Sequence, residues 1–236
     1  MRRSLAVLLS ACLAALALLA VSPSAQAAGE ITGRLVNGHA GTPAPAIAGM
    51  TVELFESVGG EPGTAPIATT TTAPDGRFSL NPGTSEASRF FVHAVANPDY
   101  QAGWVGGKPD RWLQKDLTFA NAYARDTALG AVRAIPAFIR GIVVNRATKN
   151  PVQGVTVTAR SQDKISEVDG TDVTNADGSF RINGLTCEDD CYLKINGSAR
   201  GYETGFRACN AQVVATWPAA CASPLGRIGR VYLDRL

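Results

Sequence analysis

The stretch TNADGSFRINGL at residues 174–185 decides the fold of this chain, and a looser copy, TAPDGRFSL, occupies residues 72–80. In each copy an Asp-Gly pair favours a tight turn, because Asp accepts hydrogen bonds from the turn backbone and Gly tolerates positive φ. The Phe two residues later is expected to enter a strand and point into the core. The turn motif thus comprises Asp75, Gly76, Phe78, Asp177, Gly178 and Phe180.

The region after residue 27 repeats itself, in the same order, at four further places. Residues 31–36 match 139–144, residues 48–54 match 153–159, residues 100–104 match 202–206, and residues 129–132 match 225–228. The offset drifts from 108 to 96. Ordered matches of this kind predict a tandem duplication of a unit about 105 residues long.

Each unit has the pattern of an all-β protein. Residues 51–55 and 155–159 alternate apolar and polar side chains, and turn residues recur roughly every 8–12 positions. Only residues 117–125 suggest a short helix or an irregular loop. We therefore expect two tandem seven-stranded β-sandwiches, at residues 28–137 and 138–236.

The first 27 residues have the features of a secretory signal peptide. A basic start is followed by an apolar run from Leu5 to Val21 and by the small residues of Ala25-Gln26-Ala27. An uncleaved membrane anchor and a lipidated Cys12 are alternatives. The remaining chain is expected to be soluble and to be secreted, or to lie in the periplasm or cell envelope.

Charge argues against several partners. The chain has 22 Lys+Arg and 20 Asp+Glu, a net charge of +2, but the signal segment carries two of the arginines, Arg2 and Arg3. The remaining chain is therefore neutral. Nucleic-acid binding needs clustered cations, so we expect no nucleic-acid partner and no membrane insertion of the mature chain.

Four cysteines follow the signal segment: Cys187, Cys191, Cys209 and Cys221. An even number in an exported protein indicates two disulfides. The favoured pairing is sequential, Cys187–Cys191 and Cys209–Cys221, with Cys187–Cys209 and Cys191–Cys221 as the alternative. No paired Cys-x-x-Cys pattern supports zinc, so neither a metal nor a cofactor is expected. The acidic residues between Asp163 and Asp190 suggest calcium, but solvated loop charge explains them better.

The sequence offers little to a hydrolase. Only His39 and His93 could act as a general base, and no Gly-x-Ser-x-Gly motif accompanies either. We therefore expect no catalytic residues and no enzymatic activity of the chain's own. An accessory role beside an extracellular hydrolase is the alternative.

The candidate binding surface is the segment from Trp104 to Trp112, which combines aromatic, flexible and charged residues. Sugars stack on aromatic faces while polar groups bind their hydroxyls. The alternative is that Trp104 closes one end of the sandwich. The predicted contacts are Trp104, Lys108, Asp110, Arg111 and Trp112, and the expected partner is an unidentified extracellular protein or a glycan.

The second unit resembles the carboxypeptidase regulatory-like domain family. The resemblance rests on the sequence GIVV at residues 141–144, PVQGVTV at 151–157 and the stretch at 174–185. The first unit carries a looser copy. The resemblance implies a prealbumin-like sandwich related to Cna-B-type and carbohydrate-binding-like folds. A secreted, non-catalytic binding or scaffolding protein is the corresponding expectation, with carbohydrate binding through exposed Trp residues as an alternative.

Overall fold

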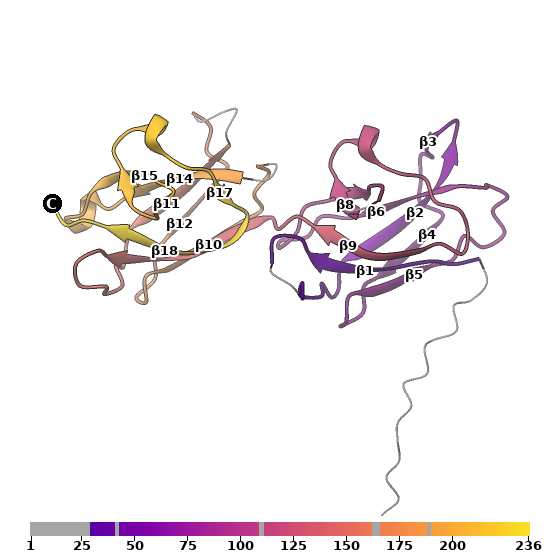
Figure 1. The fold of residues 1–236 in the computed structure, drawn as a ribbon, viewed down its shortest axis with the longest axis horizontal. Helices are drawn as coiled ribbons and strands as arrows, with labels where there is room; N and C mark the ends of the chain where they lie inside the picture. The colour runs from indigo at the N-terminus through magenta and orange to yellow at the C-terminus, as the bar shows by residue number, and fades with distance from the viewer. Residues whose placement is uncertain (1–28, 41–42, 109–110, 162–165, 188–189) are drawn as a thin grey trace, which may run out of the picture.

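The computed structural model describes residues 29–40, 43–108, 111–161, 166–187 and 190–236. The predicted signal peptide lies outside these residues. The described chain forms two units, one running from β1 (Ile31–Asn37) to β9 (Ala128–Ala134) and one from β10 (Phe138–Asn145) to β18 (Gly226–Leu233), joined by the segment between β9 and β10 (Figure 1).

The described elements of the first unit are nine strands and one short 3-10 helix. They are β1 (Ile31–Asn37), β2 (Thr51–Val58), β3 (Glu61–Pro62), β4 (Ala68–Thr71), β5 (Arg77–Leu80), β6 (Phe90–Ala94), β7 (Gly103–Val105), β8 (Arg111–Gln114), η1 (Leu117–Phe119) and β9 (Ala128–Ala134).

The second unit follows the same order. Its described elements are β10 (Phe138–Asn145), β11 (Thr156–Ser161), β12 (Gly170–Val173), β13 (Ser179–Asn183), β14 (Asp190–Asn196), η2 (Ser198–Arg200), β15 (Thr204–Arg207), β16 (Val213–Val214), η3 (Trp217–Ala219), β17 (Ser223–Pro224) and β18 (Gly226–Leu233). The predicted all-β class is confirmed. The described part of each unit holds nine strands rather than seven, because pairings as short as the two-residue β3, β16 and β17 are included.

Both units are built from two layers of strands. In the second unit the layers are separate sheets, one with the order β13-β10-β18 and one with the order β12-β11-β14-β15-β16, to which β17 adds by pairing with β14. In the first unit β8 pairs with β9, and this parallel pairing joins the corresponding layers into one continuous sheet. Each unit has its own cluster of buried apolar side chains between the layers.

The repeated Asp-Gly-x-Phe motif has the same geometry in both units. Asp177 Oδ1 accepts a hydrogen bond from the Ser179 backbone N–H at 2.9 Å, and Asp75 makes the corresponding bond at 3.0 Å. Gly178 has φ +73°, and a Cβ there would lie 2.4 Å from the carbonyl oxygen of Val143. Only glycine fits this position. Phe78 and Phe180 lie in the two cores.

The structure changes one of the sequence matches. Residues 129–132 were matched with 225–228, which places Gly130 opposite Gly226 in the alignment. In the structure both β9 and β18 contain a bulge at a glycine of positive φ, Gly130 and Gly229. Gly130 therefore corresponds to Gly229. A short match around glycine cannot distinguish the two, because Leu225-Gly226-Arg227 and Ile228-Gly229-Arg230 both place an apolar residue before a glycine and an arginine after it.

Candidate functional site

The two histidines are both engaged. His93 Nδ1 lies 3.1 Å from Glu53 Oε2, and His39 Nδ1 lies 3.0 Å from the carbonyl oxygen of Leu225 in the second unit. In the described part of the chain, neither imidazole is hydrogen-bonded to a hydroxyl or thiol group. The geometry thus offers these histidines no nucleophile to activate.

Trp104 packs within an aromatic cluster on the outer face of the first unit. Its ring centroid lies 4.6 Å from that of His93 and 5.1 Å from that of Phe55. Phe91 contributes a third neighbour, with a centroid distance of 6.3 Å. Because these rings cover part of its surface, Trp104 is only partly exposed.

Trp112 lies in a different environment, on β8 next to the joint between the units. Its ring packs on the backbone of Gly38, its centroid lies 5.8 Å from that of His39, and the Arg133 guanidinium lies 5.7 Å from it. The ring forms one wall of a cavity of about 390 Å³. The cavity is lined by His39, Trp112, Leu113, Gln114 and Ile135.

A second cavity, of about 280 Å³, shares Leu113, Gln114 and Ile135 with the first. Its other lining residues are Gln101, Lys115, Asp116 and Phe119. The side chains of Gln114 and Lys115 make no hydrogen bond or ion pair with any other described residue. Asp116 accepts a hydrogen bond from the Thr118 N–H at 2.8 Å, and this contact and the Thr118 side chain lower the pKa of its carboxyl group.

The other predicted members of the binding segment contribute no described contact to the Trp112 ring. Arg111 donates to the carbonyl oxygen of Leu129, and its guanidinium lies 5.7 Å from the Tyr123 ring, so it braces the first unit. Lys108 is exposed, and Asp110 lies outside the described residues. His39 was not predicted as a neighbour of Trp112, because the two are far apart in sequence and only the parallel layer of β1, β9 and β8 brings them together.

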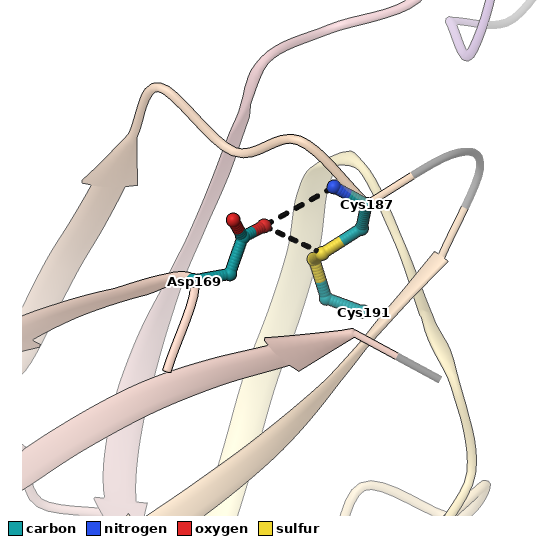
Figure 2. A group of neighbouring side chains, drawn as sticks. All are labelled: Asp169, Cys187 and Cys191. Atoms are coloured by element: carbon teal, nitrogen blue, oxygen red, sulfur yellow. Dashed lines mark hydrogen bonds between the residues drawn. A yellow bond between two sulfur atoms is a disulfide. The ribbon is translucent and has the colours of Figure 1, made fainter. Parts of the chain in front are cut away.

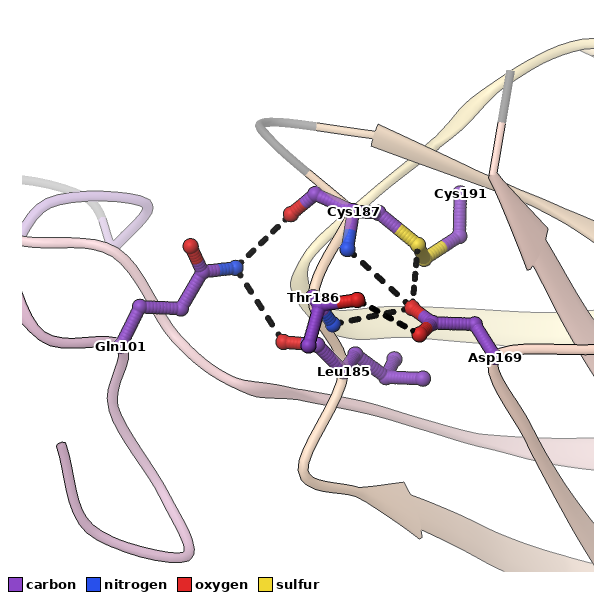
Figure 3. Close-up of a disulfide and its surroundings, with 6 residues drawn as sticks. All are labelled: Gln101, Asp169, Leu185, Thr186, Cys187 and Cys191. Carbon is purple, nitrogen blue, oxygen red and sulfur yellow. Dashed lines mark hydrogen bonds between the residues drawn. A yellow bond between two sulfur atoms is a disulfide. The ribbon is translucent and has the colours of Figure 1, made fainter. Parts of the chain in front are cut away.

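Side chains and backbone groups join the two units. Gln101 Nε2 donates to the carbonyl oxygens of Cys187 and Leu185, at 2.8 and 3.3 Å (Figure 3). The Leu185 N–H donates to the Ala137 carbonyl at 2.8 Å. Asp99 and Arg181 form an ion pair across the same joint. These contacts surround a connecting segment in which Ala137 is buried.

Both favoured disulfides, Cys187–Cys191 and Cys209–Cys221, are present. Asp169 Oδ2 lies 2.9 Å from the Cys187 sulfur and accepts a hydrogen bond from the Cys187 N–H at 3.1 Å (Figure 2). The two sulfurs and this carboxylate form a group of potential metal ligands. Metal binding requires thiolates, and sulfurs joined in a disulfide supply none, so this group braces the loop.

Some of the acidic residues considered for calcium accept hydrogen bonds from the backbone, and others lie outside the described residues. Asp163, Glu188 and Asp189 lie outside the described residues. Asp172 Oδ2 accepts from the Arg181 N–H at 2.7 Å, and Asp177 caps its own turn. Carboxylates that accept backbone N–H bonds in this way stabilise turns and neighbouring strands.

Comparison with known proteins gives a family for part of the second unit. Residues 139–216 match the carboxypeptidase regulatory-like domain family. This match supports the predicted resemblance over β10 to β16, and the first copy remains a prediction. No curated protein matches the chain.

Several solved structures show a distant similarity. The minor pilin GBS52 of Streptococcus agalactiae is 14% identical with a TM-score of 0.33, and the match covers 88% of this chain and 96% of the pilin. A double mutant of the shaft pilin SpaA from Lactobacillus rhamnosus GG is 11% identical with a TM-score of 0.34, covering 88% of this chain and 97% of SpaA. The Bacillus anthracis TIE protein is 12% identical with a TM-score of 0.33, and the match covers 89% of this chain and 34% of the TIE protein chain. TM-scores of this size do not establish a common fold.

Among the residues that the structure describes, no helix has the length and apolar character needed to cross a membrane.

Proposed function

We propose that this chain is an exported, non-catalytic binding and scaffolding protein whose two β-sandwich units act as one body. The observation that carries the proposal is the joint formed by Gln101, Asp99 and Ala137 of the first unit with Leu185, Cys187 and Arg181 of the second. A scaffold needs its modules at a fixed spacing, and direct hydrogen bonds across a short connection provide it. The default for domains joined by a linker is relative motion.

Small-angle X-ray scattering on the mature chain tests this arrangement. The wild type is expected to fit one fixed orientation of the units, whereas the double variant Asp99→Ser, Gln101→Ala is expected to require an ensemble. The matched control is Gln114→Ala, since the Gln114 side chain makes no hydrogen bond with any described residue of the second unit. A wild-type profile that already needs an ensemble contradicts the proposed single body.

The binding role needs a separate measurement. Immobilised mature chain is incubated with the native secreted fraction, glycans included, and retained partners are compared between the wild type and the joint variant. A partner that spans both units is expected to bind the joint variant more weakly. Turnover of an extracellular substrate by the chain alone contradicts a non-catalytic role.

The cavity beside Trp112 favours carbohydrate binding as a second function. It combines an indole wall with the imidazole of His39 and the amide of Gln114, which makes no hydrogen bond within the described part of the chain. An aromatic face with a few polar groups is typical of sugar sites. On a glycan array, Trp112→Ala is expected to abolish binding while Trp104→Ala retains it, because Trp104 packs within its own cluster. Equal loss in both variants, or no binding by the wild type, contradicts this assignment.

A further inference from the structure

Three arginines stand side by side on the outer face of the second unit. In the register of the sheet, Arg140 on β10 lies opposite Arg181 on β13 and opposite Arg227 on β18. Ile139, which precedes Arg140, and Ile182, which lies opposite Ile139, are both buried in the core. Since successive side chains of a strand point to opposite faces, the three arginines share the solvent face.

This arrangement is unfavourable for an isolated protein. Like charges placed directly opposite one another on a sheet are destabilising. Arg181 is neutralised by Asp99, but Arg140, Arg227 and the nearby Arg230 are exposed. Within the described part of the chain, no ion pair involves Arg140, Arg227 or Arg230.

Two arginines of the row pack against an aromatic ring. The guanidinium of Arg181 lies 4.0 Å and that of Arg140 5.7 Å from the centroid of the Phe138 ring, and Phe138 itself is buried. Cation–π contacts of this kind hold guanidinium groups in place. Two of the three guanidinium groups, those of Arg140 and Arg181, are therefore partly ordered before any ligand binds.

The first unit shows that the fold does not need these arginines. Thr32, Ser79, Ala128 and Ala131 hold the positions that correspond to Arg140, Arg181, Arg227 and Arg230. The same face of the first unit is hollow there, with an open groove of about 770 Å³. One copy of a duplicated unit thus carries small neutral side chains where the other carries four cations.

We propose that the arginine row binds an anionic polysaccharide. The planar guanidinium group binds carboxylate, sulfate and phosphate groups through two parallel hydrogen bonds. Adjacent strands lie about 4.8 Å apart, so three arginines span about 10 Å in a line, which suits a chain with anionic groups at regular intervals. The inference rests on the proposed exported binding role, because an exported protein meets polysaccharides. It does not use the Trp112 cavity, and it shares only Arg181 with the joint, where the ion pair with Asp99 stays in place.

The row is also consistent with the balanced charge of the chain. Residues 138–236 contain 12 Lys+Arg and 10 Asp+Glu, and residues 28–137 contain 8 and 10. Neither unit is strongly charged as a whole. Anion binding here depends on the position of the cations and not on net charge.

Affinity electrophoresis and biolayer interferometry test the proposal with four probes: polygalacturonate, heparin, neutral dextran and duplex DNA. The mature wild type is expected to bind at least one of the two anionic polysaccharides, to release it as NaCl rises, and to ignore dextran. The double variant Arg140→Thr, Arg227→Ala, which installs the residues of the first unit, is expected to bind at least ~10-fold more weakly, since each charged contact contributes well over RT. Arg181 is left unchanged because it also holds the joint.

The matched control removes two charges from the equivalent face of the first unit. Arg34→Ile, Arg77→Ser installs the residues found at the corresponding positions of the second unit, and it is expected to leave affinity unchanged. Both Arg77 and Arg34 already contact Asp75, through its carboxylate and its carbonyl oxygen respectively. A second row variant, Arg140→Gln, Arg227→Gln, keeps the side-chain bulk and provides an independent test if the first fails to fold.

Three results would overturn the proposal. They are equal weakening by the row and control variants, tighter binding of DNA than of both polysaccharides, and no binding of either polysaccharide at low salt. Scattering that still fits one orientation of the units, together with any of these results, leaves the proposed scaffold intact. The two proposals can therefore fail separately.

Discussion

Gln101 and Arg125 donate hydrogen bonds to corresponding pairs of backbone carbonyls, Gln101 in the second unit and Arg125 in the first. Arg125 donates to Gly83 O at 3.3 Å and to Ser85 O, within the first unit. Gln101 donates to the corresponding oxygens of the second unit, Leu185 O and Cys187 O, across the joint. The first unit therefore supplies the donor for these two carbonyls itself, whereas in the second unit the donor comes from the neighbouring unit.

This dependence predicts the effect of Gln101→Ala. Two hydrogen bonds are lost from the loop at residues 185–187, so we expect the free energy of unfolding of the second unit to fall by about 1 kcal/mol. Amide hydrogen exchange in this loop is expected to become faster, while the loop at residues 83–85 is unchanged. Gln114→Ala serves as the control. Unchanged exchange in both loops contradicts the role assigned to Gln101.

The two disulfides are expected to differ in their ease of reduction. Cys187 and Cys191 are 2% and 0% exposed, whereas Cys209 is exposed and Cys221 partly so. An attacking thiolate must reach a sulfur atom, so a mild thiol reductant should open Cys209–Cys221 first. Alkylation followed by peptide mass mapping measures the order. Earlier labelling of Cys187 or Cys191 contradicts the prediction.

Two glycines separate the cost of backbone conformation from that of a close contact. Gly178 and Gly184 have φ of +73° and +69°, but a Cβ would meet the Val143 carbonyl only at Gly178. Gly184→Ala is expected to cost about 1 kcal/mol for its positive φ, and Gly178→Ala roughly 1–3 kcal/mol more for the contact. Urea unfolding measures both. Equal costs show that the turn shifts to accommodate the methyl group.

Acid should weaken the turn at Asp177. The hydroxyl and the N–H of Ser179 hold the pKa of the Asp177 carboxyl below its ordinary value. A pKa that is lower in the folded than in the unfolded state stabilises the fold above the unfolded value, and this contribution is lost as pH falls through the folded value. The stability difference between the wild type and Asp177→Ala is therefore expected to be full at about pH 7 and to shrink below about pH 4. A difference that is constant over this range contradicts the prediction.

Much of the fold was accessible from the sequence because its signals are local. The Asp-Gly-x-Phe motif, the alternation of residues 51–55 and the even number of cysteines each predict their structure from neighbouring residues. The sequential disulfides were favoured for the same reason, since each closes a short loop. The segment from Trp104 to Trp112 was less informative. It predicted one binding surface, but Trp104 packs with Phe55 from β2, whereas Trp112 packs with His39 from beyond β1.

The sequence by itself determined the all-β class and the turns, because each follows from the conformational preferences of a few adjacent residues, and its ordered internal matches predicted the duplication. Only the tertiary structure decided which distant groups meet. It placed Gln101 on the carbonyls of the second unit, and it aligned Arg181, Arg140 and Arg227 across three strands. Net charge is a sum over the whole chain, and on that basis the sequence argued against nucleic-acid and membrane partners. The register of the sheet decides which charged side chains lie next to one another. Register between strands far apart in sequence is fixed by packing, which no short stretch of sequence encodes.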